Sequence, residues 1–420
     1  MSVVSRRNAV VIGSLLLLCS LGFGGWTALT TGTMAGLTSI YFPAGTQVGY
    51  ACGSDPAGGA TIVKTTDGGN TWTTQNPMTM QGLNSIYFTD ANNGYAVGNG
   101  GTAVRTTDGG TTWTRMTIPG SGKLNYVQFP GNGQTGYIGL SPQSGKGQVL
   151  KTTDGGSTWD SLPVGGAMNS SFSLGMSTAL IGVCVGKGGM AYGTTDGFAT
   201  ASSEGPMTIA DLVAAAFSSA DPTKGYLIGN DTAGGTPLGV IRYTADEGVS
   251  LWDSVTCPVV TSLNAVTMAT ADVGYICGDS AGSGFILRSV SPTDFWRTTV
   301  PTGTGTVNGV CFPNGSDTGY ACGGGGTILR TYDGGIPLIP GVAEGKVPAV
   351  IRTGIRVASN PCRHGIALHS DAGVRVTVFD AAGRAVMSQA ATKGLNFLPL
   401  PTGAYFVKAG AQTARAVVTD

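Results

Sequence analysis

Charged side chains are scarce in this sequence of 420 residues, since Asp, Glu, Lys and Arg together account for 11%. The 23 basic residues balance the 23 acidic ones, so there is no basic surplus to neutralise phosphates, and no nucleic-acid partner is predicted. Histidine occurs only at His364 and His369, which leaves the first 363 residues without a zinc-type cluster or a Ser-His-Asp triad. The sequence therefore predicts no metal site, no cofactor and no catalytic residues.

Long apolar runs and helical periodicity are also missing. The apolar segment at residues 9–21 is shorter than the ~20 residues that a membrane-spanning helix needs. Because it follows Arg6 and Arg7 and precedes small residues, it has the pattern of a secretory signal. Residues 1–25 are therefore predicted to be a signal peptide, with a twin-arginine or lipoprotein signal as alternatives, and the mature chain is expected to have no transmembrane span.

Paired cysteine spacings are absent as well. Seven cysteines follow the predicted signal, an odd number that does not indicate a disulfide framework. Cys52, Cys277 and Cys322 each follow a Gly-Tyr-x step and precede Gly, which predicts equivalent buried strand positions. A bridge between Cys311 and Cys322 is the alternative.

Glycine, by contrast, is abundant, and its 70 residues alternate with aromatic and β-branched ones, which favours short strands and tight turns. The clearest repeat unit comprises Leu83–Phe88, Gly94–Gly98 and Thr102–Trp113. Its Gly-Tyr step recurs seven times at intervals of 42 to 49 residues, with Val183 replacing Tyr in one copy. Four short strands fit into each interval, and this period is typical of propeller blades. The prediction is an all-β, seven-bladed β-propeller over residues 26–336.

The tryptophans predict how the ring closes. Trp72 precedes Leu83 by 11 residues, and Trp26 precedes Leu37 by the same interval although no repeat stands before it. The seventh copy ends at Gly335-Ile336 without a Trp. The N-terminal segment is therefore expected to supply the outermost strand of the last blade, which removes the free sheet edges.

The most specific motif is Thr-x-Asp-x-Gly-x-Thr-Trp. Its Asp and Gly are turn residues, and its Trp is expected to pack back on the sheet, so the motif is predicted to be structural. It resembles the Asp-box, or BNR, repeat, and with the Gly-Tyr step it resembles the repeat of the photosystem II assembly-factor family over residues 26–336. Its three intact copies contain Asp67, Gly69 and Trp72; Asp108, Gly110 and Trp113; and Asp154, Gly156 and Trp159.

A basic residue stands three positions before the box Asp in six repeats. These cations either cover apolar neighbours with their stems or form a basic band that binds an anionic partner. In the remaining repeat the position is Gly193. The candidate band consists of Lys64, Arg105, Lys151, Arg242, Arg288 and Arg330.

The C-terminal part differs in pattern. Residues 337–350 read as a linker that contains Pro and Gly, and residues 351–420 as an Ig-like β-sandwich of six or seven strands. Asn360-Pro361, Ala382-Gly-Arg384 and Tyr405–Lys408 resemble the type IX secretion C-terminal sorting domain. That resemblance implies the type IX machinery as a partner, although the basic C-terminus of the family is replaced by Val417–Asp420.

These observations predict a secreted or outer-membrane surface propeller that binds a protein or a glycan, exported by a type IX-like route. One alternative is a secreted glycoside hydrolase that uses propeller-face aspartates, since a sialidase site is not indicated: the Arg-Ile-Pro signature is absent and only three Glu exist. Another alternative is an assembly factor for a membrane protein complex. An enzyme is the less favoured reading.

Overall fold

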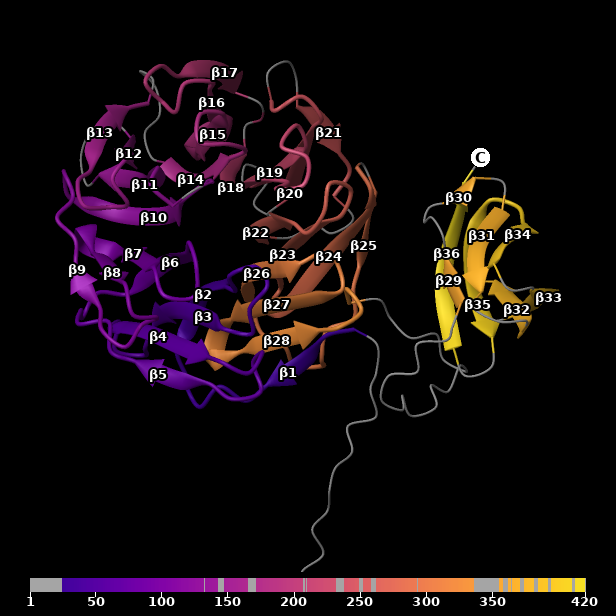
Figure 1. Ribbon diagram of the computed structural model, residues 1–420. Helices are drawn as coiled ribbons and strands as arrows, with labels where there is room; N and C mark the ends of the chain where they lie inside the picture. The colour runs from indigo at the N-terminus through magenta and orange to yellow at the C-terminus, as the bar shows by residue number, and fades with distance from the viewer. Residues whose placement is uncertain are drawn as a thin grey trace, which may run out of the picture. The chain divides into compact units, whose positions relative to one another are not determined.

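The computed structural model is shown in Figure 1. It divides into two compact units, Met1–Pro337 and Leu338–Asp420, which are described separately. Residues 1–24 of the predicted signal and the predicted linker 337–350 lie outside the described residues. The structure describes residues 25–335 and 355–419, with gaps at 132, 143–146, 165–170, 207, 209, 232–237, 249–251, 258–261, 293, 358–361, 364, 371–373, 381–383, 392–393 and 410–411.

The first unit contains seven four-stranded antiparallel sheets arranged around a common axis (Figure 1). In six of them, four strands consecutive in the chain pair in order. Sheet 1 is β2 (Gly36–Tyr41), β3 (Gly49–Ser54), β4 (Ala60–Thr65) and β5 (Thr73–Gln75); sheet 2 is β6 (Leu83–Phe88), β7 (Gly94–Gly98), β8 (Ala103–Thr106) and β9 (Thr114–Arg115); sheet 3 is β10 (Gly122–Gln128), β11 (Gly136–Pro142), β12 (Gln148–Thr152) and β13 (Asp160–Pro163).

The next three sheets repeat this order. Sheet 4 is β14 (Ser171–Met176), β15 (Gly182–Gly186), β16 (Met190–Thr194) and β17 (Ser202–Pro206); sheet 5 is β18 (Asp211–Phe217), β19 (Gly225–Asp231), β20 (Leu238–Thr244) and β21 (Asp253–Val255); sheet 6 is β22 (Ser262–Met268), β23 (Gly274–Ser280), β24 (Ser283–Ser291) and β25 (Asp294–Arg297). Three-residue 3-10 turns occur at Asn99–Gly101, Lys187–Gly189 and Gly324–Gly326. The all-β prediction is confirmed.

Sheet 7 joins the two ends of the unit. Its order is β26 (Val307–Asn314), β27 (Thr318–Gly323), β28 (Ile328–Thr331) and then β1 (Thr27–Leu29), which pairs with β28 through Thr27 opposite Arg330. Trp26 is 4% exposed and packs edge-on against Phe312, with ring centroids 5.9 Å apart. Its indole N–H donates to the Thr298 hydroxyl at 3.0 Å.

The glycine of the Gly-Tyr step is required by close packing, in most sheets against a side chain of the same sheet. In sheet 2 a Cβ on Gly94 would lie 2.4 Å from the Phe88 ring, and in sheet 1 a Cβ on Gly49 would lie 2.2 Å from Phe42. The tyrosine that follows reaches the next sheet instead. Tyr50 stacks on Phe88 with centroids 3.7 Å apart, which links sheet 1 to sheet 2.

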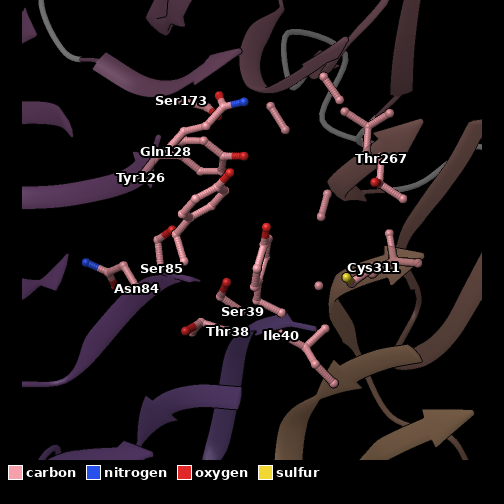
Figure 2. Close-up of a pocket in the computed structure, with 18 of the residues that line it drawn as sticks. Thr38, Ser39, Ile40, Asn84, Ser85, Tyr126, Gln128, Ser173, Thr267 and Cys311 are labelled. Carbon is pink, nitrogen blue, oxygen red and sulfur yellow. The ribbon is translucent and has the colours of Figure 1, made fainter. Parts of the chain in front are cut away.

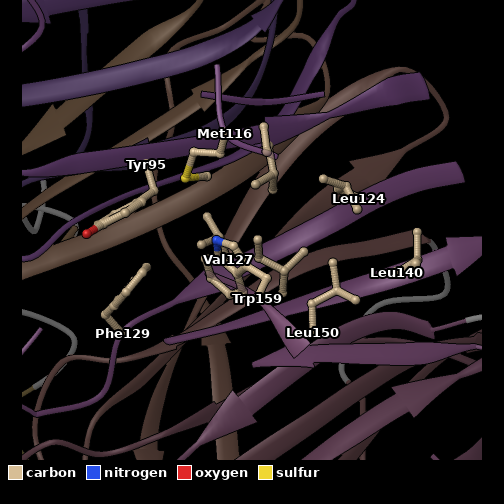
Figure 3. Packing of buried hydrophobic residues seen from close by; sticks show 11 residues of the cluster. Tyr95, Met116, Leu124, Val127, Phe129, Leu140, Leu150 and Trp159 are labelled. Atoms are coloured by element: carbon tan, nitrogen blue, oxygen red, sulfur yellow. The ribbon is translucent and has the colours of Figure 1, made fainter. Parts of the chain in front are cut away.

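The hydrophobic core lies mainly between neighbouring sheets. Figure 3 shows the cluster between sheets 2 and 3, where Tyr95 from β7 meets Phe129 and where Trp159 packs close to Val127. Equivalent clusters recur around the unit. The free energy of burial therefore stabilises each sheet through its neighbours.

The cysteines named by the sequence pattern are mostly core residues. Cys52, Cys277 and Cys322 are fully buried on equivalent second strands, and burial raises the pKa of the Cys52 and Cys277 thiols to about 12. Cys311 and Cys322 are both free thiols, so the alternative of a bridge between them is wrong. The register explains this, since Cys322 lies opposite Gly309 and Cys311 lies opposite Tyr320.

The second unit contains two sheets. Its described strands number eight rather than the six or seven expected, because two short strands precede the predicted ones. The core is formed by apolar residues such as Val376, Val378 and Val407. One sheet is β29 (Ile355–Val357), β31 (Gly365–Ser370) and β34 (Gly394–Pro399); the other, in pairing order, is β30 (Cys362–Arg363), β36 (Gln412–Thr419), β35 (Gly403–Ala409), β32 (Val374–Asp380) and β33 (Ala385–Ala391).

Candidate functional site

The Asp-box aspartates are hydrogen-bonded inside their own turns. Asp67 accepts the backbone N–H of Thr71 at 2.9 Å, the hydroxyl of Thr71 at 2.7 Å and the hydroxyl of Thr65 at 2.8 Å. These bonds lower the pKa of the Asp67 carboxyl to about 2. Asp108 and Asp154 make the same set of bonds, and the pKa of each is also lowered to about 2.

The glycines of the boxes take a left-handed conformation that other residues adopt at a cost. Gly69 has φ 90°, and its N–H donates to the Thr65 hydroxyl at 2.9 Å. In sheet 4 the equivalent residue is Phe198, which keeps φ 62° and the same bond to Thr194. Phe198 is buried in a cluster that Ala201 also contacts, and Ala201 stands where the intact boxes have Trp.

Four of the six cations in the candidate basic band donate to carbonyl oxygens of the following sheet. The Gly109 carbonyl of the sheet 2 box accepts both the Tyr50 hydroxyl at 2.9 Å and Lys64 Nζ at 2.6 Å. Arg330 in turn donates to the Gly68 carbonyl of sheet 1 at 2.8 Å. Arg105 donates to Gly155 at 3.3 Å and Lys151 to Gly197 at 3.1 Å.

The remaining members of the band bind within their own sheet. Arg288 Nε donates to the Tyr275 hydroxyl at 2.9 Å, and Arg242 contacts the Ser254 hydroxyl. Gly193, at the equivalent position of sheet 4, has no side chain and makes no such hydrogen bond. All six cations are half-buried, and each one has a hydrogen-bond partner inside the first unit. A role of the band in binding an anionic partner stays a prediction.

A second set of contacts between sheets was not predicted from the sequence. The first strand of each sheet contains a bulge, and in sheets 1, 2, 6 and 7 the polar residue there donates to a backbone carbonyl of the next sheet. In sheet 5, where the bulge residue is Val213, Asn230 on β19 bonds to Leu263 instead. The donors to the next sheet are Thr38 to Leu83 at 2.9 Å, Asn84 to Leu124 at 2.8 Å, Asn264 to Val307 at 2.9 Å and Asn308 to Leu37 at 2.9 Å.

The first strands surround a cavity of about 300 Å³ on the axis of the unit (Figure 2). Its lining comes from one strand of each of the seven sheets: β2, β6, β10, β14, β18, β22 and β26. None of the lining residues is Asp, Glu, Lys, Arg or His. The cavity is therefore a neutral site bounded by hydroxyl, amide, aromatic and small apolar side chains.

The wall of the cavity is uneven. Sheets 1 to 3 contribute Tyr41, Tyr87 and Tyr126, and the first two rings contact each other with centroids 4.6 Å apart. Burial raises the pKa of all three phenols above its usual value, so they stay protonated donors at neutral pH. On the lining strands of the later sheets small residues predominate: Gly175, Ala214, Ala216, Ala265 and Gly309.

The family follows from a match that spans most of the propeller. The sequence profile described as photosynthesis system II assembly factor YCF48 matches residues 77–351. This chain belongs to that family. The BNR-type repeat expected from the Asp-boxes and the propeller fold are thereby confirmed.

Solved structures show the same fold as this member of the YCF48 family. A structure titled "YCF48 bound to D1 peptide" is 22% identical, with 74% of this chain and 98% of the other covered at a TM-score of 0.58. YCF48 from Cyanidioschyzon merolae is 18% identical over 74% of this chain and 99% of its own, also at 0.58. The GH74 enzyme of Niastella koreensis is 14% identical, covering 94% and 73% at 0.58. No curated protein sequence matches the chain.

Among residues that the structure describes, no group of three or more His, Cys, Asp or Glu is placed to hold a metal ion. No helix in the same part of the chain is long and apolar enough to cross a membrane. His364 lies outside the described residues.

The polar bulge residues and the cavity wall are the functional features that sequence reasoning missed. A signal for the bulge residues did exist, because Leu83-Asn84, Leu124-Asn125 and Leu263-Asn264 repeat an Asn after the first core residue. The wall has no such signal. Its residues differ from sheet to sheet, and only the ring arrangement brings them together.

Proposed function

We propose that the YCF48-family unit of this protein is a seven-bladed propeller, closed by its N-terminal strand, that binds a segment of another protein. The observation that carries the binding role is the relative solved with a bound D1 peptide, a fold match that this chain covers almost end to end. The internal contacts of the chain support it. Box aspartates and basic residues are bonded within the ring, which leaves the loops between strands for recognition of a peptide.

The family favours a second candidate, an assembly factor for a membrane protein complex. The two candidates share peptide binding and differ in what the bound segment belongs to. A glycoside hydrolase is less well supported, because the GH74 similarity at 14% identity concerns the fold. The aspartates that recur in the boxes are also committed to turns.

Export to the cell surface is the second part of the proposal. The resemblance of residues 351–420 to a type IX sorting domain, together with the signal pattern at residues 1–25, supports secretion in two steps. The second unit, with two sheets and its own core, is then an Ig-like module that the export machinery recognises.

Peptide binding is tested with the full mature chain and an array of overlapping peptides from the membrane and outer-membrane proteins of the host. We expect a small set of peptides to bind and to compete with one another in solution. Binding of no peptide above the level of an unrelated propeller would reject the proposal. If the bound peptides all come from one membrane complex, the assembly-factor candidate is favoured.

Export is tested in a host that has a type IX system by comparing the full chain with a chain that ends at residue 350. We expect the full chain at the cell surface or in the medium and the shortened chain in the periplasm. Equal amounts of both at the surface would contradict the sorting role.

A further inference from the structure

The axial cavity presents hydrogen-bonding groups without protein partners. Ser173 is 3% exposed, lines the cavity from β14, and its hydroxyl has no hydrogen-bond partner. A buried hydroxyl left without a partner destabilises the fold. The Ser173 oxygen is closed off from the open space, so the groups that face a ligand are other hydroxyls of the lining.

Two more hydroxyls in the lining also lack a hydrogen-bond partner. In the described part of the chain, neither Tyr126 on β10 nor Thr267 on β22 has a hydrogen bond through its hydroxyl. Figure 2 shows these residues on opposite sides of the cavity. A hydroxyl both donates and accepts, so two such groups on opposite walls suit a ligand that carries several hydroxyls itself.

The absence of charge in the lining restricts the ligand further. An ionised group brought into this cavity would lose water without gaining a countercharge, at a cost of several kcal/mol. The cations of the basic band bond to box-turn carbonyls or to hydroxyls of their own sheet, and none of them lines the cavity. A neutral ligand avoids that cost.

The size of the cavity and the shape of its wall also favour a small neutral ligand. A cavity of about 300 Å³ lies at the small end of ligand pockets, which span ~300–1,000 Å³. That is room for one or two rings and too little for several residues of peptide. Tyr faces provide an amphipathic surface for the C–H face of a ring, and Ala214 and Ala216 leave the space opposite.

We propose that the axial cavity is a binding site for a neutral sugar, held against Tyr126 and hydrogen-bonded by the hydroxyls of Tyr126 and Thr267. This site is separate from the peptide binding proposed above and does not depend on it. It would allow the propeller to bind a neutral glycan end while its loops bind a protein.

The experiment titrates the full mature chain by calorimetry with the neutral disaccharides cellobiose, maltose, lactose and N,N′-diacetylchitobiose. Digalacturonic acid and N-acetyltyrosinamide are the charged and aromatic comparison ligands. We expect at least one neutral disaccharide to bind and digalacturonic acid not to bind. If no neutral disaccharide binds, or if N-acetyltyrosinamide alone binds, the proposal is overturned.

The location is tested by filling the cavity. Ala216 lies opposite Tyr226 in its sheet as Tyr41 lies opposite Tyr50, so the ring already accommodates a Tyr at that position. Ala216→Tyr is expected to lower the affinity more than tenfold. Unchanged affinity in a folded Ala216→Tyr protein would place the sugar elsewhere and reject the site.

A gentler pair of variants covers the case in which Ala216→Tyr does not fold. Tyr126→Phe removes one hydroxyl from the cavity and is expected to weaken binding by roughly fivefold, the value of one hydrogen bond. Tyr332→Phe removes a phenol hydroxyl from a 64% exposed residue that directly follows β28, and it should bind as the unmodified chain does. Equal affinities for the two variants would also reject the site.

Discussion

The Asp-boxes of sheets 1 to 3 and the box of sheet 7 reach the same geometry by different chain paths. In sheet 1 the carboxylate of Asp67 accepts the N–H of Thr71, four residues along the same turn. In sheet 7 the carboxylate of Asp333 accepts the N–H of Gly25, which is 308 residues away in sequence. The tryptophan contacts agree closely, with ring centroids 6.1 Å apart for Phe42 and Trp72 and 5.9 Å for Phe312 and Trp26.

This difference teaches that the box is a spatial arrangement rather than a stretch of sequence. The turn supplies Thr, Asp and Gly, while the strand that follows supplies an N–H and a Trp. A strand from the far end of the chain serves equally well once it lies in place. The added requirement in sheet 7 is the entropy of bringing distant residues together, which grows slowly with their separation.

The largest effect that probes this comparison is expected for Trp26→Ala, with Trp113→Ala as its match in a continuous box. Both indoles are 4% exposed, so each truncation should lower the free energy of unfolding by about 3–5 kcal/mol. Urea denaturation of the two variants measures it. A loss below about 1 kcal/mol for Trp26→Ala alone would show that the divided box does not stabilise the ring.

Next in size is Asn308→Ala, which removes the bond from sheet 7 to the Leu37 carbonyl of sheet 1. The unsatisfied buried carbonyl should lower stability by about 1–3 kcal/mol. Asn84→Ala is the matched change between sheets 2 and 3. Similar losses of stability in the two variants mean that the hydrogen bond between sheets 7 and 1 stabilises the fold as much as one between consecutive repeats does.

A smaller effect, this time an increase in stability, is expected in the box turn of sheet 5, which has Glu247 where the intact boxes have Gly. Glu247 has φ 64° and its N–H donates to the Thr223 carbonyl, as Gly68 does to Gln47 in sheet 1. Glu247→Gly should therefore raise stability by about 1 kcal/mol, because a left-handed conformation costs other residues about that much. Gly68→Glu is the reverse change and should lower it. A destabilising Glu247→Gly would mean that the Glu side chain outweighs the strain.

The smallest expected effect is on the pH dependence of stability. The folded-state pKa values of Asp67, Asp108 and Asp154 are lowered to about 2, below the ~3.9 of an unfolded Asp. Their contribution is therefore present above pH ~4 and is lost as the pH falls through about 2. Solvent screening keeps it modest, because these carboxylates are exposed.

Asp108→Asn should make the melting temperature less sensitive to pH between 4 and 2, since that variant has one fewer carboxylate to protonate. Asp160→Asn, a change at another exposed carboxylate on β13, serves as the control. Parallel melting curves for the unmodified chain and Asp108→Asn over that pH range would contradict the linkage.

Much of the repeat architecture could be predicted from local pattern. The Gly-Tyr spacing locates second strands, and the motif around Asp67 locates a turn, because both depend on residues close in sequence. The contacts between sheets could not be predicted in the same way. Lys64 meets Gly109 and Asn84 meets Leu124 only after the sheets have taken their positions around the axis.

The cavity was the least predictable part. Tyr126, Ser173 and Thr267 come from three different sheets and occupy no common motif. Ser173 in particular reads as an ordinary strand residue in the sequence. Its missing partner becomes visible only when the neighbouring side chains are in place.

The side-chain amides at the bulges donate in one direction around the ring. Asn84 donates forward to Leu124 and Asn308 forward to Leu37, while the Val127 N–H donates back to Ser85. Each sheet therefore presents one face to the next sheet and a different face to the one before. Head-to-tail contacts of this kind grow into an open helix unless their rotation adds up to a full circle. The protein is thus comparable to a cyclic oligomer whose subunits share one chain. A repeat gained or lost during evolution would have to come with a change in the angle between all the others.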